Sequence, residues 1–228
     1  IKNNLKNAYI RPLCFYGSEG MGLRADNLKV HCAVAAWDWG PYLGAEQIEK
    51  GIRVKVSPFP KRDPEAMLYK AKATGNYINS MLALRDALSS GYDEALILGT
   101  DNTVNEGSGE NFFMVKDNKL VTPELITVLN GITRKSVVEI AKDWGMEVQE
   151  RKIEVKEVSD ALKDGSLTEA FGAGTAATIA PISNISLNGE NFPIPESKDY
   201  HFHKKVLKYL SEYKMGIHPD KFNWLIKV

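Results

Sequence analysis

Short hydrophobic runs of two kinds divide this chain of 228 residues. Runs that are rich in β-branched and aromatic residues, or in which apolar and polar positions alternate, predict strands, because the side chains of a strand point to its two faces in turn. Stretches that contain Gly, Pro and Asn lie between these runs and predict turns. The expected strands lie at 8–16, 28–37, 52–57, 94–98, 111–115, 119–122, 146–153, 167–174 and 179–187.

Other segments carry apolar residues three or four positions apart, which is the spacing of one helix face. The clearest is 73–89, where Tyr77, Ile78 and Met81 begin such a stripe and Gly91 marks its end. The segment TRKSVVEIAKDWG has the same amphipathic pattern with a glycine stop. The expected helices lie at 73–89, 133–145, 155–165 and 200–213.

Strands and helices of this kind, joined by short loops, indicate an α/β or α+β fold with a mixed sheet. The stretch WDWGPYLGAEQIEKG, interrupted by Gly and Pro, is the best candidate for a domain boundary. We therefore expect residues 1–43 to be the C-terminal part of a small domain, 44–50 an interdomain connection, and 51–228 a large domain.

The composition narrows the class of protein. Lys plus Arg and Asp plus Glu each number 29, so the formal net charge is zero and the chain is not expected to bind nucleic acid. No apolar run approaches the ~20 residues of a membrane span, and no secretory signal is visible. The two cysteines, Cys14 and Cys32, lie in strand-like segments, and we expect them to be small buried core residues of a cytoplasmic protein.

Several polar residues are candidates for chemistry. Lys70 and Lys72 precede the expected 73–89 helix, and the residues alone do not decide whether either is a reactive amine. Glu106 and Glu110 flank a glycine-containing turn, where a carboxylate can approach a ligand closely or remain an exposed loop acid. Tyr9 and Arg11 share one face of a strand, and the Arg11 guanidinium can bind a carboxylate or form a structural ion pair.

Two turns are candidates for binding an anion. Gly131, Ile132 and Thr133 lie where a helix begins, with Thr133 as a possible N-cap, and free N–H groups at a helix start suit a phosphate. FGAGTAA fits the G-x-G-x-x-A dinucleotide fingerprint, but that motif requires a helix after it. A β-branched run with Pro181 follows instead, which favours a Gly-rich turn with the Thr175 hydroxyl over a nicotinamide-cofactor site.

We expect no metal site. His201 and His203 are two residues apart in an expected helix, where this spacing points side chains away from each other.

The motifs together resemble the class IV (fold type IV) aminotransferases. EGSGENFF, then LVT, then LNGITR match the spaced signature of that family, and AYIRPL, GMGL, WGPYLGAE, KATGNY and GTAA are similar to its branched-chain amino acid aminotransferases. The resemblance runs from residue 8 to the C-terminus. It implies a fold type IV large domain with part of a smaller N-terminal α/β domain. It also implies transamination of Leu, Ile and Val with 2-oxoglutarate or glutamate through pyridoxal 5'-phosphate, in a homodimer or larger homo-oligomer.

The resemblance implies roles for matched residues. Lys72, and not Lys70, would be the catalytic lysine that bonds to the cofactor, and we expect burial and the cofactor to lower its pKa. Tyr77 would hydrogen-bond the phenolic oxygen of the cofactor, and Glu106 would hold the proton on its pyridine nitrogen. The phosphate would be held, mostly by main-chain N–H groups, by Ile132, Thr133, Gly174 and Thr175.

Substrate contacts follow from the same resemblance. Tyr9 and Arg11 would recognise carboxylates, with Arg11 on the side chain of glutamate. Trp39 and Tyr42 would line the apolar pocket. The GMGL loop would reach the partner subunit's site. The full expected substrate-binding set is Tyr9, Arg11, Met21, Leu23, Trp39, Tyr42, Thr175 and Ala176.

Alternatives remain at this point. Another class IV enzyme, a D-amino acid aminotransferase or an aminodeoxychorismate lyase, would share the cofactor motifs, although Tyr9, Arg11 and Trp39 favour the branched-chain enzymes. The chain begins at Ile1, and family members carry a further stretch that supplies most of the small domain and an arginine for the phosphate. We therefore expect an N-terminal segment to be missing, which leaves an inactive cofactor-binding remnant as the other alternative.

Overall fold

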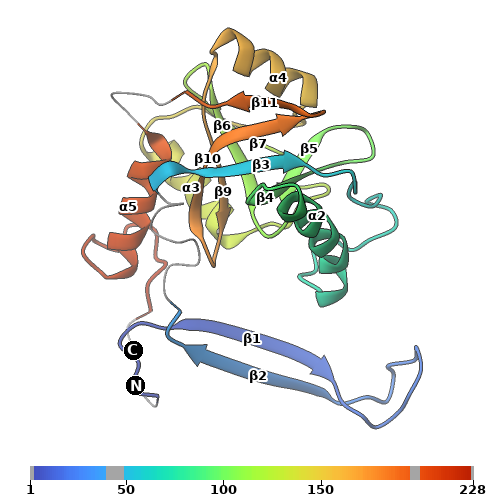
Figure 1. Ribbon diagram of the computed structural model, residues 1–228. Helices are drawn as coiled ribbons and strands as arrows, with labels where there is room; N and C mark the ends of the chain where they lie inside the picture. Colours follow the sequence, from blue (N-terminus) through green and yellow to red (C-terminus); the bar gives the residue numbers. More distant parts are fainter. Residues whose placement is uncertain (1–2, 40–48, 196–200, 227–228) are drawn as a thin grey trace. The chain divides into compact units, whose positions relative to one another are not determined.

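The structure, a computed structural model, describes residues 3–39, 49–195 and 201–226. The chain separates into two compact units, Ile1–Tyr42 and Leu43–Val228. In the first unit, strands β1 (Tyr9–Tyr16) and β2 (Val30–Trp37) form an antiparallel pair (Figure 1).

Both cysteines are exposed, so the expectation that they are buried core residues is wrong. The physical reason is that the described part of the first unit holds this one two-stranded sheet and no second layer to cover its faces. In the register of the two strands, Cys14 lies opposite Cys32 and Arg11 lies opposite Ala35.

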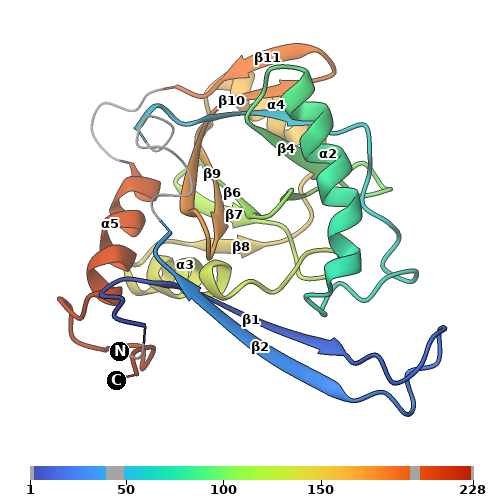
Figure 2. The same cartoon turned by 60° about the horizontal axis from the view of Figure 1, so that its bottom comes forward.

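Six strands of the second unit close into a ring, which Figure 2 shows most clearly. The ring closes because β9 pairs with both β10 and β6, while the other neighbours pair in the order β10, β3, β4, β5, β6. Strand β3 runs parallel to β10 and β4, and the other pairs in the ring are antiparallel. The mixed α/β class is therefore confirmed. The ring strands are β3 (Ile52–Val56), β4 (Glu94–Leu98), β5 (Val104–Gly107), β6 (Asn111–Lys116), β9 (Leu167–Gly174) and β10 (Thr178–Leu187), and β7 (Lys119–Thr122), β8 (Val148–Glu150) and β11 (Glu190–Pro193) extend the sheet.

The four expected helices are all present, with ends that differ by a few residues. Helix α2 packs on β4, α3 on β8 and β9, α4 on β9 and β11, and α5 on β9 and β10. Helix α4 is capped at its C-terminus by Gly165, whose φ of +78° is a conformation that glycine adopts without strain. The bounds are η1 (Thr74–Asn76), α2 (Tyr77–Ser89), α3 (Ile132–Asp143), α4 (Val155–Asp164) and α5 (Phe202–Lys214). None of the described helices combines the length and the apolar composition that a membrane span requires.

Strand alternation distributes the core over both faces of the ring. On β6, Phe112 and Met114 belong to one hydrophobic cluster, and Phe113 belongs to a second that α3 and α5 complete. The Phe113 ring stacks on Phe171 of β9 with centroids 5.1 Å apart, and Phe202 of α5 lies 6.0 Å from Phe171. Each fully buried aromatic side chain of this kind contributes roughly 1.5–3 kcal/mol of transfer free energy. The second cluster thus fixes α5 against β9.

The segment FGAGTAA forms the end of β9 and the turn into β10, where Gly174 pairs with Thr178. A strand follows the glycines, and the requirement of the dinucleotide fingerprint for a helix is not met. The nicotinamide-cofactor interpretation is therefore excluded by the fold, and the Gly-rich turn remains.

The two histidines lie together, contrary to the expectation that they point apart. His201 has extended backbone before α5 and His203 lies in the first turn, so helical spacing does not apply to the pair, and their ring centroids are 5.1 Å apart. The Glu169 carboxylate accepts the backbone N–H groups of Phe202 (2.7 Å) and His203 (3.0 Å) and lies 2.7 Å from the His203 Nδ1. Burial alone would raise the pKa of Glu169, but the hydrogen bonds from His203 and Phe202 outweigh it and lower this pKa. The ionised carboxylate is a cap for α5.

Candidate functional site

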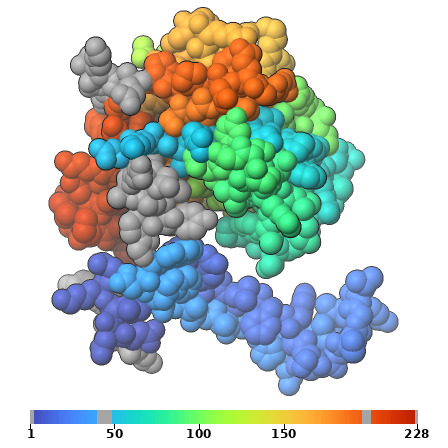
Figure 3. All heavy atoms as spheres, viewed as in Figure 1, coloured from blue at the N-terminus to red at the C-terminus, as the bar shows by residue number. Residues whose placement is uncertain are grey.

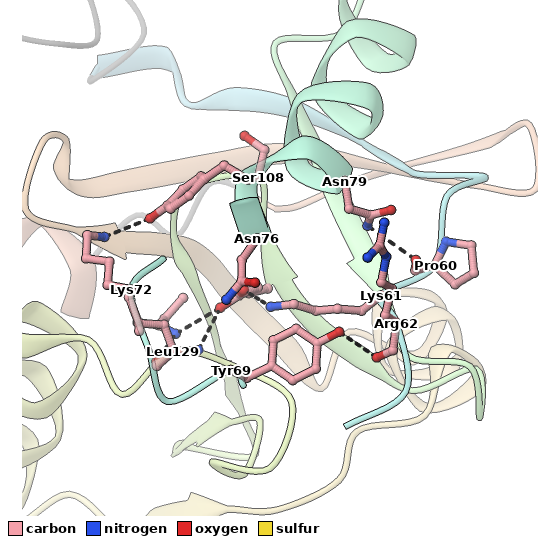
Figure 4. A network of polar contacts seen from close by, with 12 residues as sticks. Pro60, Lys61, Arg62, Tyr69, Lys72, Asn76, Asn79, Ser108 and Leu129 are labelled. Atoms are coloured by element: carbon pink, nitrogen blue, oxygen red, sulfur yellow. Dashed lines mark hydrogen bonds and ion pairs between the residues drawn. The ribbon is translucent and has the colours of Figure 1, made fainter. Parts of the chain in front are cut away.

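One cavity of the second unit gathers several of the predicted residues (Figure 4). Its walls come from the loop before α2, the first turn of that helix, the turn between β5 and β6, and the loop before α3. The residues that line it include Lys61, Tyr69, Lys72, Asn76, Tyr77, Ser80, Glu106, Ser108, Glu110, Asn111 and Leu129.

Lys72 and Tyr77 meet at one side of the cavity. The Lys72 Nζ donates a hydrogen bond of 2.7 Å to the Tyr77 hydroxyl. The 3₁₀ turn η1 lies between the two residues in the sequence, and Tyr77 is the first residue of α2. The Asn76 side-chain amide donates to the Ala71 (3.1 Å) and Leu68 (3.3 Å) carbonyl oxygens and ties down the loop that carries Lys72. Lys72 is nevertheless exposed in the described chain, so the burial that we expected for it is not provided by these residues.

Glu106 is held at another wall by three partners. The Lys61 ammonium contacts its Oε1, the Leu129 backbone N–H donates to Oε2 at 3.2 Å, and the Asn111 amide lies 3.5 Å from Oε2. The Glu106 side chain is only 14% exposed and that of Lys61 only 10%. Burial raises the pKa of Glu106, while the charge and hydrogen bond of Lys61 oppose the rise. Burial and the pairing with Lys61 therefore act in opposite directions on the proton affinity of this carboxylate.

Lys61 was not predicted from the sequence. It lies in a Pro-rich loop that gives no signal of an inward side chain. Its backbone N–H donates to the Leu98 carbonyl oxygen at 2.7 Å, and its Nζ lies 4.7 Å from the centroid of the Tyr69 ring. The Tyr69 hydroxyl in turn donates to the Arg62 carbonyl oxygen at 2.6 Å. These contacts hold Lys61 where its ammonium meets Glu106, and Figure 4 shows Lys61 beside Tyr69 and Arg62.

Asn111 joins Glu106 to the start of α3. Its amide donates to the Leu129 carbonyl oxygen at 2.9 Å, and a Cβ at Gly131 would lie 2.3 Å from its Oδ1. Gly131 is the N-cap of α3, with no side-chain hydrogen bond to the cap, so the expectation that Thr133 is the N-cap is wrong. Close packing of Asn111 requires a glycine there. The first-turn N–H groups of α3, which include those of Ile132 and Thr133, thus have no side-chain cap.

The second predicted anion turn starts beside Asn111. Asn111 pairs across the sheet with Ala173, Gly174 ends β9, and Thr175 follows in the turn. Thr175 is exposed and Ala176 half-buried. These residues and Ile132 and Thr133 are not among those that line the cavity. Strand β6, through Asn111, and the Leu129 N–H connect the start of α3 with Glu106.

Tyr9, Arg11 and Trp39, which are expected to contact substrate, lie in the first unit. The Arg11 guanidinium carbon lies 5.3 Å from the ring centroid of Tyr9, 5.7 Å from that of Trp37 and 5.5 Å from that of Trp39. Tyr9 and Trp39 pack edge to face, with centroids 4.5 Å apart. Trp37, which the sequence analysis did not identify, shares this aromatic cluster because it pairs with Tyr9 across the two strands. The three rings hold the Arg11 guanidinium in place through cation–π contacts.

Two other residues expected to contact substrate or the partner subunit are outside this aromatic cluster. Met21 and Leu23 are 103% and 105% exposed, respectively, in the loop between β1 and β2. Tyr42 lies outside the described residues.

Glu110 is a further acid in the cavity wall, and the alternative of an exposed loop acid is wrong for it. Burial and, to a smaller extent, the charge of Glu94 raise its pKa to about 8. Burial also raises the pKa of Glu94. The Glu110 carboxylate lies against β9, where a Cβ at Gly172 would be 1.9 Å from its Oε2. The EGSGEN motif was the available signal for Glu110.

The chain is similar to known proteins along its length. It matches the family model described as "Amino-transferase class IV" over residues 1–185. It is 48% identical over 184 residues to the branched-chain-amino-acid aminotransferase of Pseudomonas aeruginosa, with 81% of this chain and 58% of that protein covered. The chain thus spans less than two thirds of that relative.

Solved structures agree. The crystal structure of the Escherichia coli branched-chain amino acid aminotransferase has a TM-score of 0.89 and 36% identity, covering 99% of this chain and 72% of that one. A branched-chain amino acid aminotransferase from the source abbreviated T.th., complexed with N-(5'-phosphopyridoxyl)-L-glutamate, has a TM-score of 0.83 and 35% identity, covering 99% and 70%. This T.th. enzyme has also been solved with 4-methylvaleric acid. The chain therefore belongs to the class IV aminotransferase family, whose cofactor is pyridoxal phosphate.

Proposed function

We propose that this chain takes part in the transamination of branched-chain L-amino acids (Leu, Ile and Val) with 2-oxoglutarate and glutamate. The observation that carries the proposal is the meeting of an amine, a phenol and a buried carboxylate, from Lys72, Tyr77 and Glu106, in one cavity. The names of the similar proteins, and the glutamate and 4-methylvaleric acid groups bound by the T.th. enzyme, support the choice of substrates.

The donor set fits pyridoxal phosphate. Lys72 offers a primary amine to its aldehyde, Tyr77 a hydroxyl to its phenolic oxygen, and Glu106 a carboxylate to its ring nitrogen. The start of α3 offers N–H groups that no side chain caps, together with the positive end of the helix dipole, to its phosphate. When bound, the cofactor supplies an electron sink that makes the substrate Cα proton removable.

The residues of this chain then have separate tasks. Lys72 Nζ would accept the proton from the substrate Cα as a general base and later return a proton as a general acid. The Tyr77 hydroxyl, 2.7 Å away, would orient the Lys72 amine. The Glu106 carboxylate, whose charge is stabilised by Lys61 and the Leu129 N–H, would hold the proton on the ring nitrogen.

Substrate recognition requires one site to accept an apolar side chain and a carboxylate. We propose that the aromatic rings around Arg11 offer the apolar surface and that the Arg11 guanidinium pairs with the side-chain carboxylate of glutamate, which must not be left unpaired. Arg11→Ala should lower kcat/KM for glutamate by about 10–100-fold, the value of a lost charged hydrogen bond, with a much smaller effect on leucine. Arg24→Ala, in the exposed loop, is the control. Equal losses for both substrates would refute dual recognition.

The two neighbouring lysines provide the main test. The purified chain is incubated with pyridoxal phosphate, reduced with borohydride and mapped by peptide mass spectrometry, and turnover of L-leucine with 2-oxoglutarate is measured separately. We expect the label on Lys72 and a loss of turnover of about 10³-fold or more in Lys72→Ala, while Lys70→Ala retains both. A label on another lysine contradicts the proposed site. Preference for D-leucine would indicate a D-amino acid aminotransferase, and labelling of Lys72 without turnover of either enantiomer would indicate a cofactor-binding remnant.

We further propose that the protein works as a homodimer or larger homo-oligomer. Helix α2 supports this, because it carries the exposed apolar residues Ile78 (57%), Met81 (69%) and Leu82 (46%). Figure 3 shows the green segment that contains α2 at the surface of the second unit. Sedimentation velocity should show the wild-type chain as an oligomer and Met81→Glu shifted toward the monomer, with Lys204→Glu on α5 as the control. Unchanged assembly of Met81→Glu argues against an interface on α2.

We also propose a cytoplasmic location. Its support is the cysteine count, because two cysteines in a chain of this size do not form the disulfide framework that is typical of small secreted proteins. Cell fractionation of the tagged protein tests it, and recovery in a secreted fraction would contradict it.

A further inference from the structure

We propose that Cys14 and Cys32 are a thiol modification site that closes reversibly into one intramolecular disulfide across β1 and β2. They are the two cysteines of the chain, they lie directly opposite each other in the strand register, and their Sγ atoms are 2.8 Å apart. Both residues are exposed in the described chain, so a small oxidant can reach them. The proposal concerns the thiols and stands apart from the proposed function.

The backbone already meets the demands of a disulfide. Directly opposed residues of antiparallel strands have Cα atoms about 4.5 or 5.5 Å apart, and disulfides form at Cα separations of about 4.4–6.8 Å. The pairing continues on both sides, with Leu13 opposite Ala33 and Phe15 opposite His31. Closure therefore needs a change of side-chain torsion angles and no shift of the strands.

The chemistry balances with a low-molecular-weight disulfide such as oxidised glutathione as the oxidant. The Cys14 thiolate attacks one glutathione sulfur, breaks the glutathione S–S bond and releases one glutathione thiolate, which takes up a proton. The Cys32 thiolate then attacks the Cys14 sulfur of the mixed disulfide and releases the second glutathione. Two protein thiols are oxidised and one glutathione disulfide is reduced to two thiols. The hydrogen bond with Cys14 raises the pKa of Cys32, which favours Cys14 as the attacking sulfur.

The pair does not use the side chains proposed for substrate. Cys14 is three residues from Arg11 on β1, and an odd separation places the two side chains on opposite faces of the strand. A bond at Cys14 and Cys32 would instead fix covalently the register that places Arg11 opposite Ala35. Oxidation would thus form a covalent bond on β1, the strand that carries Arg11, and would leave the Arg11 side chain unmodified.

The test equilibrates the full chain over a series of reduced-to-oxidised glutathione ratios, then blocks free thiols with an alkylating reagent and measures intact mass. We expect a single transition in which both alkylation sites are lost together and the unmodified mass falls by two hydrogen atoms. After denaturation and trypsin digestion, peptides 7–24 and 30–50 should be recovered joined, and should separate on reduction.

Control variants decide between a directed pair and two reactive thiols. Cys14→Ser and Cys32→Ser should each give a single mixed disulfide with glutathione. The double variant Cys32→Ser with Ala33→Cys keeps two thiols but turns one to the other face of β2, and should remain open at ratios that close the wild type. Wild-type protein that instead takes up two glutathiones, or that crosslinks between chains, would overturn the proposal.

Discussion

Glu110→Gln should remove a pH dependence from the stability of the protein. The carboxyl of Glu110 lies in the cavity wall with its pKa raised from 4.5 to about 8 by burial and by Glu94. Because the folded state then binds the proton more tightly than the unfolded chain, the stabilisation from this group is complete below pH 4.5 and is lost as the pH rises to about 8. Glutamine has nearly the same shape and no charge to titrate.

The magnitude follows from the shift. A rise of the pKa from 4.5 to about 8, at about 1.36 kcal/mol per unit, limits the loss to about 5 kcal/mol. Most of it falls between about pH 5 and pH 9, where the linkage relation gives about 4 kcal/mol. Glu110 keeps partial contact with solvent, which stabilises its charged form, so we expect a loss of about 2 kcal/mol in practice.

Equilibrium urea unfolding, followed by tryptophan fluorescence at several values between about pH 5 and pH 9 and at constant ionic strength, measures this loss. The difference in unfolding free energy between Glu110→Gln and wild type should favour the variant increasingly as the pH rises. Glu190→Gln, at an exposed position of β11, should leave the wild-type slope unchanged. Parallel curves for wild type and Glu110→Gln would show that Glu110 is ionised throughout, and would refute the assignment of a neutral acid to the cavity wall.

Three further changes probe the core and the site. Phe171→Ala should cost about 3–5 kcal/mol in urea unfolding because it empties a fully buried ring position between two packed aromatic residues, and a cost below about 1 kcal/mol would contradict that packing. Gly172→Ala should cost about 1–3 kcal/mol through its clash with Glu110, and a double-mutant cycle with Glu110→Ala should recover most of that cost, whereas additive losses would exclude the clash. Lys61→Met should raise the pKa of Glu106 further and weaken pyridoxal phosphate binding by about tenfold or more in a fluorescence titration, and unchanged affinity would show that the ion pair does not prepare the carboxylate.

The secondary structure was predictable where local pattern and packing agree. Helix α4 follows from its apolar spacing and its stop at Gly165, and β6 follows from a run that is buried on both faces. Strands β5 and β11 were not predicted, because each has four residues and is defined by its partners more than by its composition. The closed ring could not be predicted either, because it requires β9 to pair with β6, which is distant from it in the sequence, as well as with β10.

The candidate site divides in the same way. The resemblance identified Lys72, Tyr77 and Glu106, which line one cavity, but it gave no reason for Lys61 to point inward. Long-range contacts also decided the cap of α3: Asn111 packs against Gly131, and this contact, which no local propensity of Thr133 encodes, fixes where the helix begins. Sequence motifs thus located the groups proposed to perform chemistry, and the structure located the groups that pack against them.

The charge balance of the cavity explains why such holding groups are needed. A buried carboxylate without a partner costs several kcal/mol, and the pairing of Lys61 and the Leu129 N–H with Glu106 lowers this cost. A protonated ring nitrogen would bring a second positive charge to the same carboxylate, and a phosphate at the start of α3 would bring a compensating negative charge. The Asn111 side chain contacts both Glu106 and the turn before α3. The same side chain would therefore help to position the group that pairs with the ring nitrogen and the turn that holds the phosphate. Binding of the cofactor ring nitrogen and binding of its phosphate should therefore be coupled through Asn111, the first residue of β6.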